Sequence, residues 1–262
     1  ADPELLRQAG LHADRLSINV ELPTEPGLKR LAPEKDGRRI EGAMAQMRSQ
    51  MDDMGDARRK YRHAPRFAPA GQSTQMIVGA DAADDRAIIQ RASSLYDRHR
   101  LRRVYYSAFS PIPSPSSVLP LKRPPLMREH RLYQSDWMMR FYGYSATEIA
   151  AATDRDSGCL PLDIDPKLAW ALQHRASFPV DVNHAPREML LRVPGLGVKA
   201  VDRILASRRH RRLRLEDVAR LTTSIVKLRP FLIAADWRPV QLADRVDLSA
   251  QLRRPAAQLE LF

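Results

Sequence analysis

The sequence predicts an α/β fold in the amino-terminal part of the chain and an all-α fold further on. Three short segments have the length and composition of strands, and they cover residues 16–22, 75–79 and 103–109. Amphipathic patterns with helical spacing separate them, over residues 39–54 and 82–99. An alternation of strand and helix is typical of parallel βα units. Nearer the carboxyl terminus, two amphipathic segments that meet at a glycine-rich turn indicate the helical part.

Two segments of the α/β part carry further expectations about burial. The segment Gln75 to Gly79 is short and apolar enough to be a strand buried on both faces. The helix expected over residues 39–54 places its methionines on one face, where the core would hold them; they are Met44, Met47, Met51 and Met54. These methionines are therefore expected to be core residues rather than part of a metal or cofactor site.

A proline-rich connector is expected over residues 111–130, followed by a helical connector over residues 131–180. Prolines among serines resist helix formation and give a stiff segment. The sequence leaves open whether this segment is a free linker or a packed loop. In the helical connector, Tyr133, Trp137 and Phe141 recur every four residues, which favours a core-facing stripe. The alternative is a set of exposed aromatic rings that stack on bases.

The glycine-rich turn is Val193-Pro194-Gly195-Leu196-Gly197-Val198. A helix is expected before it, from Pro186, and another after it, with Val198, Val201 and Ile204 at helical spacing. Both glycines are expected to allow positive φ angles and a bare backbone. Backbone N–H groups at the start of the second helix could then approach an anion.

The charge around this turn favours a polyanion. From residue 186 to residue 214 there are nine basic and two acidic residues, a local net charge of +7. The residues expected to bind the polyanion are Pro194, Gly195, Leu196, Gly197, Lys199 and Arg203. The alternative is a buried hairpin of two helices whose glycines only permit close packing.

Composition narrows the classes of protein further. The 262 residues include 43 Lys and Arg against 31 Asp and Glu, a formal net charge of +12. Nucleic acid is therefore the favoured partner, although a generally basic proteome would give the same excess. Cys159 is the only cysteine, which excludes a disulfide framework and an intrachain thiolate cluster. The lone cysteine fits a reducing, cytoplasmic location, and because no apolar run of membrane-spanning length occurs, no membrane partner is expected.

The turn belongs to a longer pattern. Asp181-Val182-Asn183, then residues 191–197, Ala200 and Ile204, resemble the helix-hairpin-helix module of DNA-repair and DNA-uptake proteins. The resemblance implies a DNA-binding domain over residues 181–235 that grips the duplex backbone without reading its sequence. A second hairpin is expected over residues 214–232, where Thr222-Thr223-Ser224 replaces the glycine turn and points to a structural role.

The α/β part has its own resemblance. Residues 15–21, 74–80 and 103–111, with a helix-hairpin-helix downstream, resemble the last three strands of a radical S-adenosylmethionine (radical SAM) barrel, a partial TIM-like barrel. The matching family is the one assigned to DNA modification or repair. The resemblance implies that residues 1–110 are the carboxyl-terminal half of that barrel. It also implies that the cofactor lies at the carboxyl ends of the strands, at Ser17, Asn19, Glu21 and Gly79.

In that family a CxxxCxxC loop holds a [4Fe-4S] cluster that cleaves S-adenosylmethionine. This sequence has no such motif. The chain is therefore expected to be either a fragment that lacks the first half of the barrel or a degenerate paralogue. Two functions stay open: a DNA-binding radical SAM protein, and a non-enzymatic DNA-binding or scaffold protein with the same hairpin. The target base, and whether the substrate is DNA or RNA, cannot be read from the residues.

The last segment, residues 236–262, is expected to be an extended tail. Its final five residues, Gln258-Leu259-Glu260-Leu261-Phe262, resemble the peptide that docks bacterial DNA-processing enzymes on the replication sliding clamp. Glu260 departs from the usual pattern at the middle position. Gln258, Leu259, Leu261 and Phe262 are the expected clamp-binding residues. The alternative is a tail that folds back on its own domain.

Overall fold

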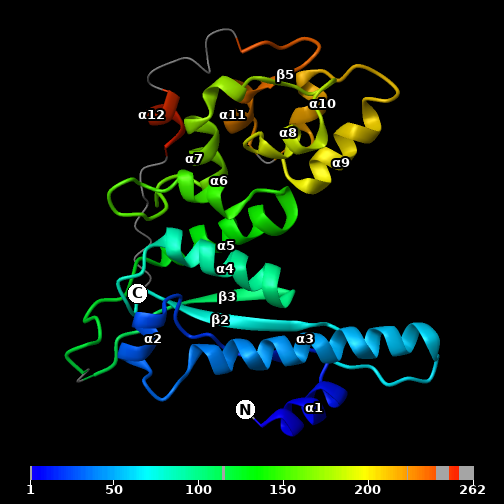
Figure 1. Cartoon of the computed structure of the whole chain (residues 1–262). Coiled ribbons are helices and arrows are strands. Elements are labelled where there is room, and N and C mark those ends of the chain that lie inside the picture. Colours follow the sequence, from blue (N-terminus) through cyan, green and yellow to red (C-terminus); the bar gives the residue numbers. More distant parts are fainter. Residues whose placement is uncertain (1, 114–115, 223, 240–247, 254–262) are drawn as a thin grey trace. The chain divides into compact units, whose positions relative to one another are not determined.

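The structure is a computed structural model, and it describes residues 2–113, 116–222, 224–239 and 248–253. The chain divides into two compact units, Ala1–Asp136 and Trp137–Phe262, and each unit is described by itself. About half of the chain is helical (Figure 1). Its strands form two small parallel sheets, and the described ranges contain no closed barrel. No helix in these ranges is long and apolar enough to cross a membrane.

The first unit is built on a three-stranded parallel sheet in the order β1-β2-β3. Its elements are α1 (Pro3–His12), β1 (Leu16–Ser17), α2 (Glu25–Leu31), α3 (Gly37–Lys60), β2 (Gln72–Val78), α4 (Asp85–His99), β3 (Arg103–Ala108) and the start of α5 (Leu126–Tyr142). Ser17 lies opposite Ser73, and Thr74 lies opposite Val104. The prediction of parallel βα units is confirmed.

The edge strand is shorter than the expected 16–22. Regular pairing stops after Ser17 and resumes only at Glu21, which forms a bridge to Met76. In between, the Val20 N–H donates to the Thr74 hydroxyl, 3.0 Å away, in place of a carbonyl. Between these two paired positions the edge strand has three residues, 18–20, and β2 has two, 74 and 75, which is the geometry of a bulge. The left-handed φ of +63° at Glu21 accompanies this interruption.

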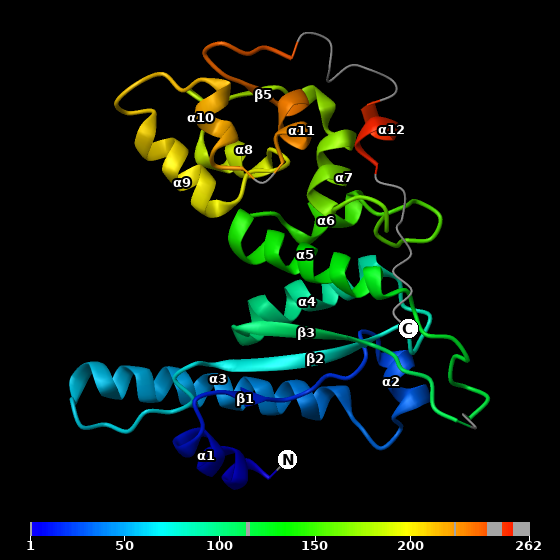
Figure 2. The same ribbon diagram turned by 180° about the vertical axis from the view of Figure 1, so that it is seen from behind.

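Helices α3 and α4 cover the same face of the sheet (Figure 2). The buried Gln72 side chain donates to the carbonyl oxygens of Met44 in α3 and His99 in α4, at 3.2 and 2.7 Å. On the opposite face Gln75 and Ile77 are only half-buried. The expectation that this strand is buried on both faces was therefore wrong.

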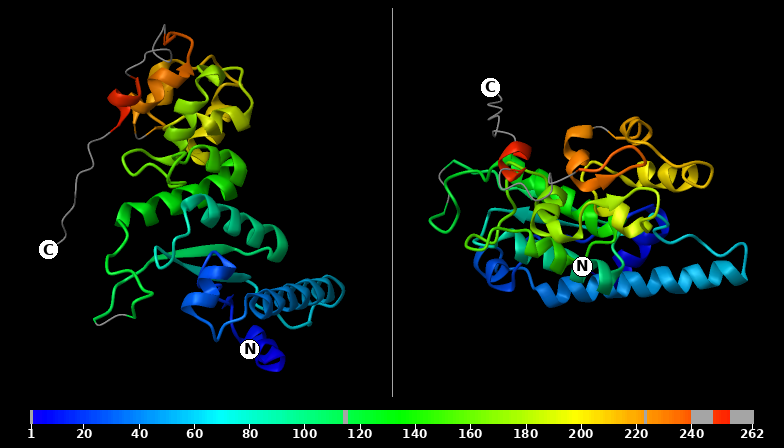
Figure 3. Two further views of the ribbon diagram at one scale, coloured as in Figure 1. Left: turned by 60° about the vertical axis from the view of Figure 1, so that its left-hand side comes forward. Right: turned by 90° about the horizontal axis from the view of Figure 1, so that it is seen from above.

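The methionine helix is longer than predicted. It has 24 residues, begins after the capping side chain of Asp36 and runs past the end of the sheet (Figure 3). Met44 and Met47 are fully buried. Met51 and Met54 are half-buried and pack against the buried cluster of Met47, Phe67 and Ala68. The predicted core position is therefore confirmed for Met44 and Met47. Met51 and Met54, further along the helix, are only partly buried.

One residue near the end of the proline-rich connector, Pro124, packs against the residue that follows β2. A Cβ placed on Gly79, which follows β2 with a φ of +80°, would lie 2.8 Å from the Pro124 ring. The helix α5 then returns along β3, where the Tyr133 hydroxyl donates to the Tyr106 carbonyl oxygen at 2.9 Å. Of the two alternatives, a free linker and a packed loop, the described residues thus support packing at Pro124.

The aromatic stripe of α5 is not a core stripe along its whole length. Tyr133 is half-buried against β3, but Trp137 and Phe141 are 50% and 42% exposed. Met138, one position further round the helix, is buried instead. The expectation of a core position was therefore wrong for Trp137 and Phe141.

The second unit is mainly helical but contains a two-stranded parallel sheet, β4 (Val180–Asp181) with β5 (Leu232–Ile233). The expectation of an all-α domain was wrong, because two-residue strands leave no periodic pattern in the sequence. The remaining elements are α6 (Ala146–Ala151), α7 (Pro166–Gln173), η1 (Arg175–Ser177), α8 (Arg187–Arg192), α9 (Val198–Ser207), α10 (Leu215–Ala219), α11 (Ile225–Leu228), η2 (Arg229–Phe231) and α12 (Leu248–Leu252).

Both hairpins lie in the sequence between the two paired strands of this sheet. Val180 pairs with Leu232, and the Val182 N–H donates to the Ile233 carbonyl oxygen. Beneath them Phe178 packs edge-on against Phe231, with ring centroids 5.1 Å apart, and against Trp170. The sheet and this aromatic cluster therefore hold together the two ends of the hairpin segment.

Candidate nucleic-acid interface

The turn between α8 and α9 has one strained glycine and one ordinary one. Gly195 has a φ of +90°, which disfavours any side chain. Gly197 has φ −102° and ψ 171°, an extended conformation open to all residues, and it is the N-cap of α9. The expectation of positive φ is met at Gly195 and was wrong at Gly197.

A buried lysine holds this turn in place. The Lys167 ammonium, on α7, lies 2.5 Å from the Leu196 carbonyl oxygen and 4.7 Å from the centre of the Tyr142 ring. Burial lowers the pKa of Lys167 to about 7, although nearby Asp165 acts in the opposite direction. Asp165 is itself paired with Lys227 of α11 at 2.6 Å. One chain of polar contacts thus joins α7, the turn and the second hairpin.

The second hairpin supports the first one directly. The Thr222 hydroxyl donates to the Gly195 carbonyl oxygen at 2.8 Å. A Cβ on Gly195 would lie 3.2 Å from both this hydroxyl and the Ser224 carbonyl oxygen. Close packing of the two turns is therefore one reason for the glycine at 195, and it agrees with a structural role for the second hairpin.

The loop after α9 is fixed by Asn183. Its side-chain amide donates to the Leu213 carbonyl oxygen at 3.2 Å, and its carbonyl oxygen accepts the Leu213 N–H at 2.7 Å. Arg208 donates to the carbonyl oxygens of Val182 and Ala185 at 3.2 and 2.7 Å. The Asp-Val-Asn segment before the hairpin therefore has a structural task, which is to position the arginine-rich loop.

The nine cations near the turn fall into two groups. Four are engaged by protein groups: Arg187 with Asp202, Arg192 with Glu148, Arg211 with Asp217, and Arg208 with the carbonyls described above. The other five are exposed and form no ion pair within the described part of the chain: Lys199, Arg203, Arg209, Arg212 and Arg214. Lys199 and Arg203 are four residues apart, so they lie on one face of α9.

The amino terminus of α9 lies beside these two cations. No side chain caps it, and the Gly197 carbonyl oxygen accepts the Val201 N–H at 2.9 Å. The N–H groups of a first helical turn are left without helical partners and carry a partial positive charge. Bare N–H groups and two exposed cations form a surface suited to a phosphate group.

The six residues expected to bind DNA contribute in different ways. Pro194 and Leu196 are buried, so their side chains anchor the turn and cannot touch a ligand. Gly197, Lys199 and Arg203 are the members with accessible groups beside the helix terminus. Sequence reasoning missed Lys167 and Thr222; the signal for Lys167 was a single charge within the apolar segment of α7.

The residues expected to bind S-adenosylmethionine are not brought together in one site. Ser17 lies opposite Ser73 near the amino-terminal end of β2 and donates to Asn19 at 2.9 Å, so its placement at the carboxyl end was wrong. Glu21 accepts a hydrogen bond from Lys35 at 2.5 Å. Gly79 does lie at the carboxyl end of β2, and the Pro124 ring covers it.

The residues of this chain also do not fit the iron–sulfur cluster. A [4Fe-4S] cluster takes thiolate ligands, and Cys159 is the only cysteine. Among the described residues there is no cluster of His, Cys, Asp and Glu that could hold a metal ion.

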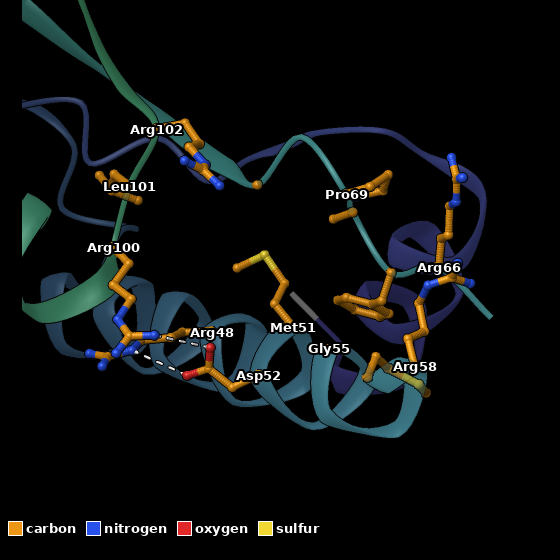
Figure 4. Close-up of a pocket in the computed structure, with 14 residues that line it drawn as sticks. Arg48, Met51, Asp52, Gly55, Arg58, Arg66, Pro69, Arg100, Leu101 and Arg102 are labelled. Atoms are coloured by element: carbon orange, nitrogen blue, oxygen red, sulfur yellow. Dashed lines mark hydrogen bonds and ion pairs between the residues drawn. The ribbon is translucent and has the colours of Figure 1, made fainter. Parts of the chain in front are cut away.

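A cationic cavity of about 700 Å³ lies at the other end of the strands (Figure 4). Its walls carry five arginines around an apolar floor that includes Met51 and Phe67. Asp52 pairs with two of them, Arg48 and Arg100, at 3.7 and 3.3 Å. The cavity is thus partly neutralised from within, and it shares none of the residues expected to bind the cofactor.

No protein-family model, curated protein or solved structure matches this chain. The expected clamp-binding residues Gln258, Leu259, Leu261 and Phe262 lie outside the residues that the structure describes.

Proposed function

We propose that this chain binds duplex DNA by its phosphate backbone, at the turn of residues 193–198 and the first turns of α9, as part of a DNA modification or repair protein. The observation that carries the proposal is the uncapped amino terminus of α9 beside the exposed Lys199 and Arg203. Its resemblance to the helix-hairpin-helix module supports DNA as the polyanion.

The proposed contacts are sequence-independent. Backbone N–H groups and lysine or arginine side chains at phosphates fix the position of a protein on the duplex but carry no information about bases. Their binding free energy comes largely from counterion release, so it falls steeply with salt. The Lys167 and Thr222 contacts contribute by holding the turn rigid before DNA arrives.

The test is a fluorescence-anisotropy titration of labelled duplexes of two unrelated sequences over a series of salt concentrations. Lys199→Ala should weaken binding to both sequences equally and reduce the magnitude of the salt slope by about one. Arg59→Ala is the matched control, because it removes an exposed arginine that pairs with Asp56 in α3 and belongs to the first unit. Unchanged binding in Lys199→Ala and Arg203→Ala would mean that the hairpin is only a packing turn.

The radical SAM resemblance implies iron–sulfur ligands that this chain, with one cysteine, does not itself supply. The function proposed for these residues is therefore binding. A scaffold protein without catalysis would use the same turn in the same way. Competition by duplex RNA in the titration above separates DNA from RNA as the polyanion, because the two helices present phosphates at different groove widths.

A further inference from the structure

Two exposed aromatic side chains lie next to each other at the carboxyl-terminal end of α5. The rings of Trp137 and Phe141 have centroids 4.4 Å apart and are tilted by 45°. About half of each side chain is exposed, while Met138 and Tyr144 nearby are buried. Adjacent exposed apolar side chains often mark an interaction site. We call Trp137 and Phe141 the aromatic pair.

A chain of contacts within the second unit connects the aromatic pair to the glycine-rich turn. The Trp137 side chain hydrogen-bonds to the Tyr142 hydroxyl, and the indole N–H is its only donor. That hydroxyl would lie 3.5 Å from a Cβ placed on Gly197, the N-cap of α9. The Tyr142 ring also packs on the Lys167 ammonium, which holds the Leu196 carbonyl. The aromatic pair is therefore positioned by the same residues that position the proposed phosphate site.

The surrounding charge indicates what covers the aromatic pair. An apolar protein segment would suit aromatic rings alone, but the Arg140 guanidinium lies over the Phe141 ring at 4.8 Å. The adjoining hairpin segment, residues 186–214, carries a net charge of +7. The ligand that combines flat aromatic rings with an anionic backbone is a nucleic-acid strand with unpaired bases.

We propose that Trp137 and Phe141 stack on an unpaired base of a DNA strand whose neighbouring phosphates occupy the amino terminus of α9. The proposal rests on the proposed function, since the turn supplies the phosphate contacts. The stacking site specifies which DNA the chain prefers. A duplex interrupted by a bulge or a short gap should bind more tightly than an intact duplex. Base stacking on one aromatic residue typically strengthens binding by about ten-fold.

The experiment compares an intact duplex with the same duplex carrying one bulged 2-aminopurine, whose fluorescence is quenched on stacking. We expect the full chain to bind the bulged duplex about ten-fold more tightly than the intact one and to quench the probe. Phe141→Ala should remove most of the preference and the quenching but leave the intact-duplex affinity unchanged, because it keeps the Trp137 side chain that bonds Tyr142. Leu162→Ala, another exposed apolar residue of this unit, is the control and should change neither.

Two further variants separate stacking from indirect effects on the turn. Phe141→Leu keeps an apolar side chain without a flat ring and should lose most of the quenching. Trp137→Phe keeps an aromatic ring but lacks the N–H that bonds Tyr142, and this variant should retain the quenching. Equal binding of both duplexes by the unaltered chain, with intact-duplex binding preserved, would overturn this inference and leave the proposed function standing. Binding to neither duplex would overturn both.

Discussion

The ammonium group of Lys167 lies 2.5 Å from the carbonyl oxygen of Leu196, in the middle of the turn that carries the proposed phosphate site. Lysine is rarely buried unless it is paired, and here a backbone carbonyl and the face of Tyr142 replace water around the charge. The turn is therefore anchored by a side chain that belongs to neither of the two helices that the turn joins.

This anchor predicts a pH-dependent stability. Burial lowers the pKa of Lys167 to about 7, whereas in the unfolded chain its pKa is about 10.4. Between these values the unfolded state binds more protons than the folded state, so stability rises with pH, by at most about 1.4 kcal/mol per pH unit. Denaturant unfolding of the protein and of Lys167→Met, followed from about pH 7 to about pH 9.5, should show this rise in the unaltered chain only. The same slope in both proteins would contradict it.

The two glycines of the turn predict two different phenotypes. At Gly195 a side chain meets both a φ of +90° and the Ser224 carbonyl oxygen, so Gly195→Ala should lower the free energy of unfolding by about 1–3 kcal/mol. At Gly197 the backbone is extended, and among the described residues a Cβ would meet the Tyr142 hydroxyl at 3.5 Å, an ordinary van der Waals distance. Gly197→Ala should therefore lower the free energy of unfolding by less than about 1 kcal/mol.

Duplex binding should separate the same two variants. The Gly197→Ala methyl group lies at the N-cap beside the proposed phosphate site, so affinity should fall while stability is nearly kept. Melting curves and anisotropy titrations on both variants check this pair of outcomes. Equal losses of stability at positions 195 and 197 would show that the turn has another conformation.

Sequence periodicity predicted the parallel sheet of the first unit because β2 and β3 are long enough to show it. Strands β4 and β5 have two residues each, so their pairing depends on tertiary contacts that no local pattern reveals. The break in the edge strand depends on Thr74, a residue of the neighbouring strand, and was equally invisible.

The candidate site was predictable in position but not in detail. Its glycines and cations identified the turn, yet spacing alone could not tell which glycine needs a positive φ. That distinction arises from the second hairpin, whose Thr222 packs on Gly195. Likewise, a repeat of four placed Trp137 and Phe141 on one helix face, but whether other elements cover that face is decided by the fold.

Another prediction concerns cofactor chemistry. One cysteine cannot supply the three thiolates of a CxxxCxxC loop, so anaerobic incubation of this chain with iron and sulfide should give no [4Fe-4S] absorbance above that of Cys159→Ser. S-adenosylmethionine added with a reductant should stay intact. A stable cluster together with formation of 5′-deoxyadenosine would contradict the prediction and would require ligands of another kind.

The last prediction concerns the terminal peptide Gln258-Leu259-Glu260-Leu261-Phe262, which we propose to dock on a bacterial sliding clamp. Leu261 and Phe262 would fill an apolar pocket while the Gln258 amide makes directional hydrogen bonds, so a few anchors would carry most of the affinity. Attachment to a clamp would raise the local concentration of a sequence-independent DNA binder at replicating DNA. The full chain and its Leu261→Ala, Phe262→Ala variant should be titrated against purified clamp without DNA. We expect the substitutions to abolish binding and leave duplex affinity unchanged; equal binding, or none by either protein, would refute clamp docking through this peptide.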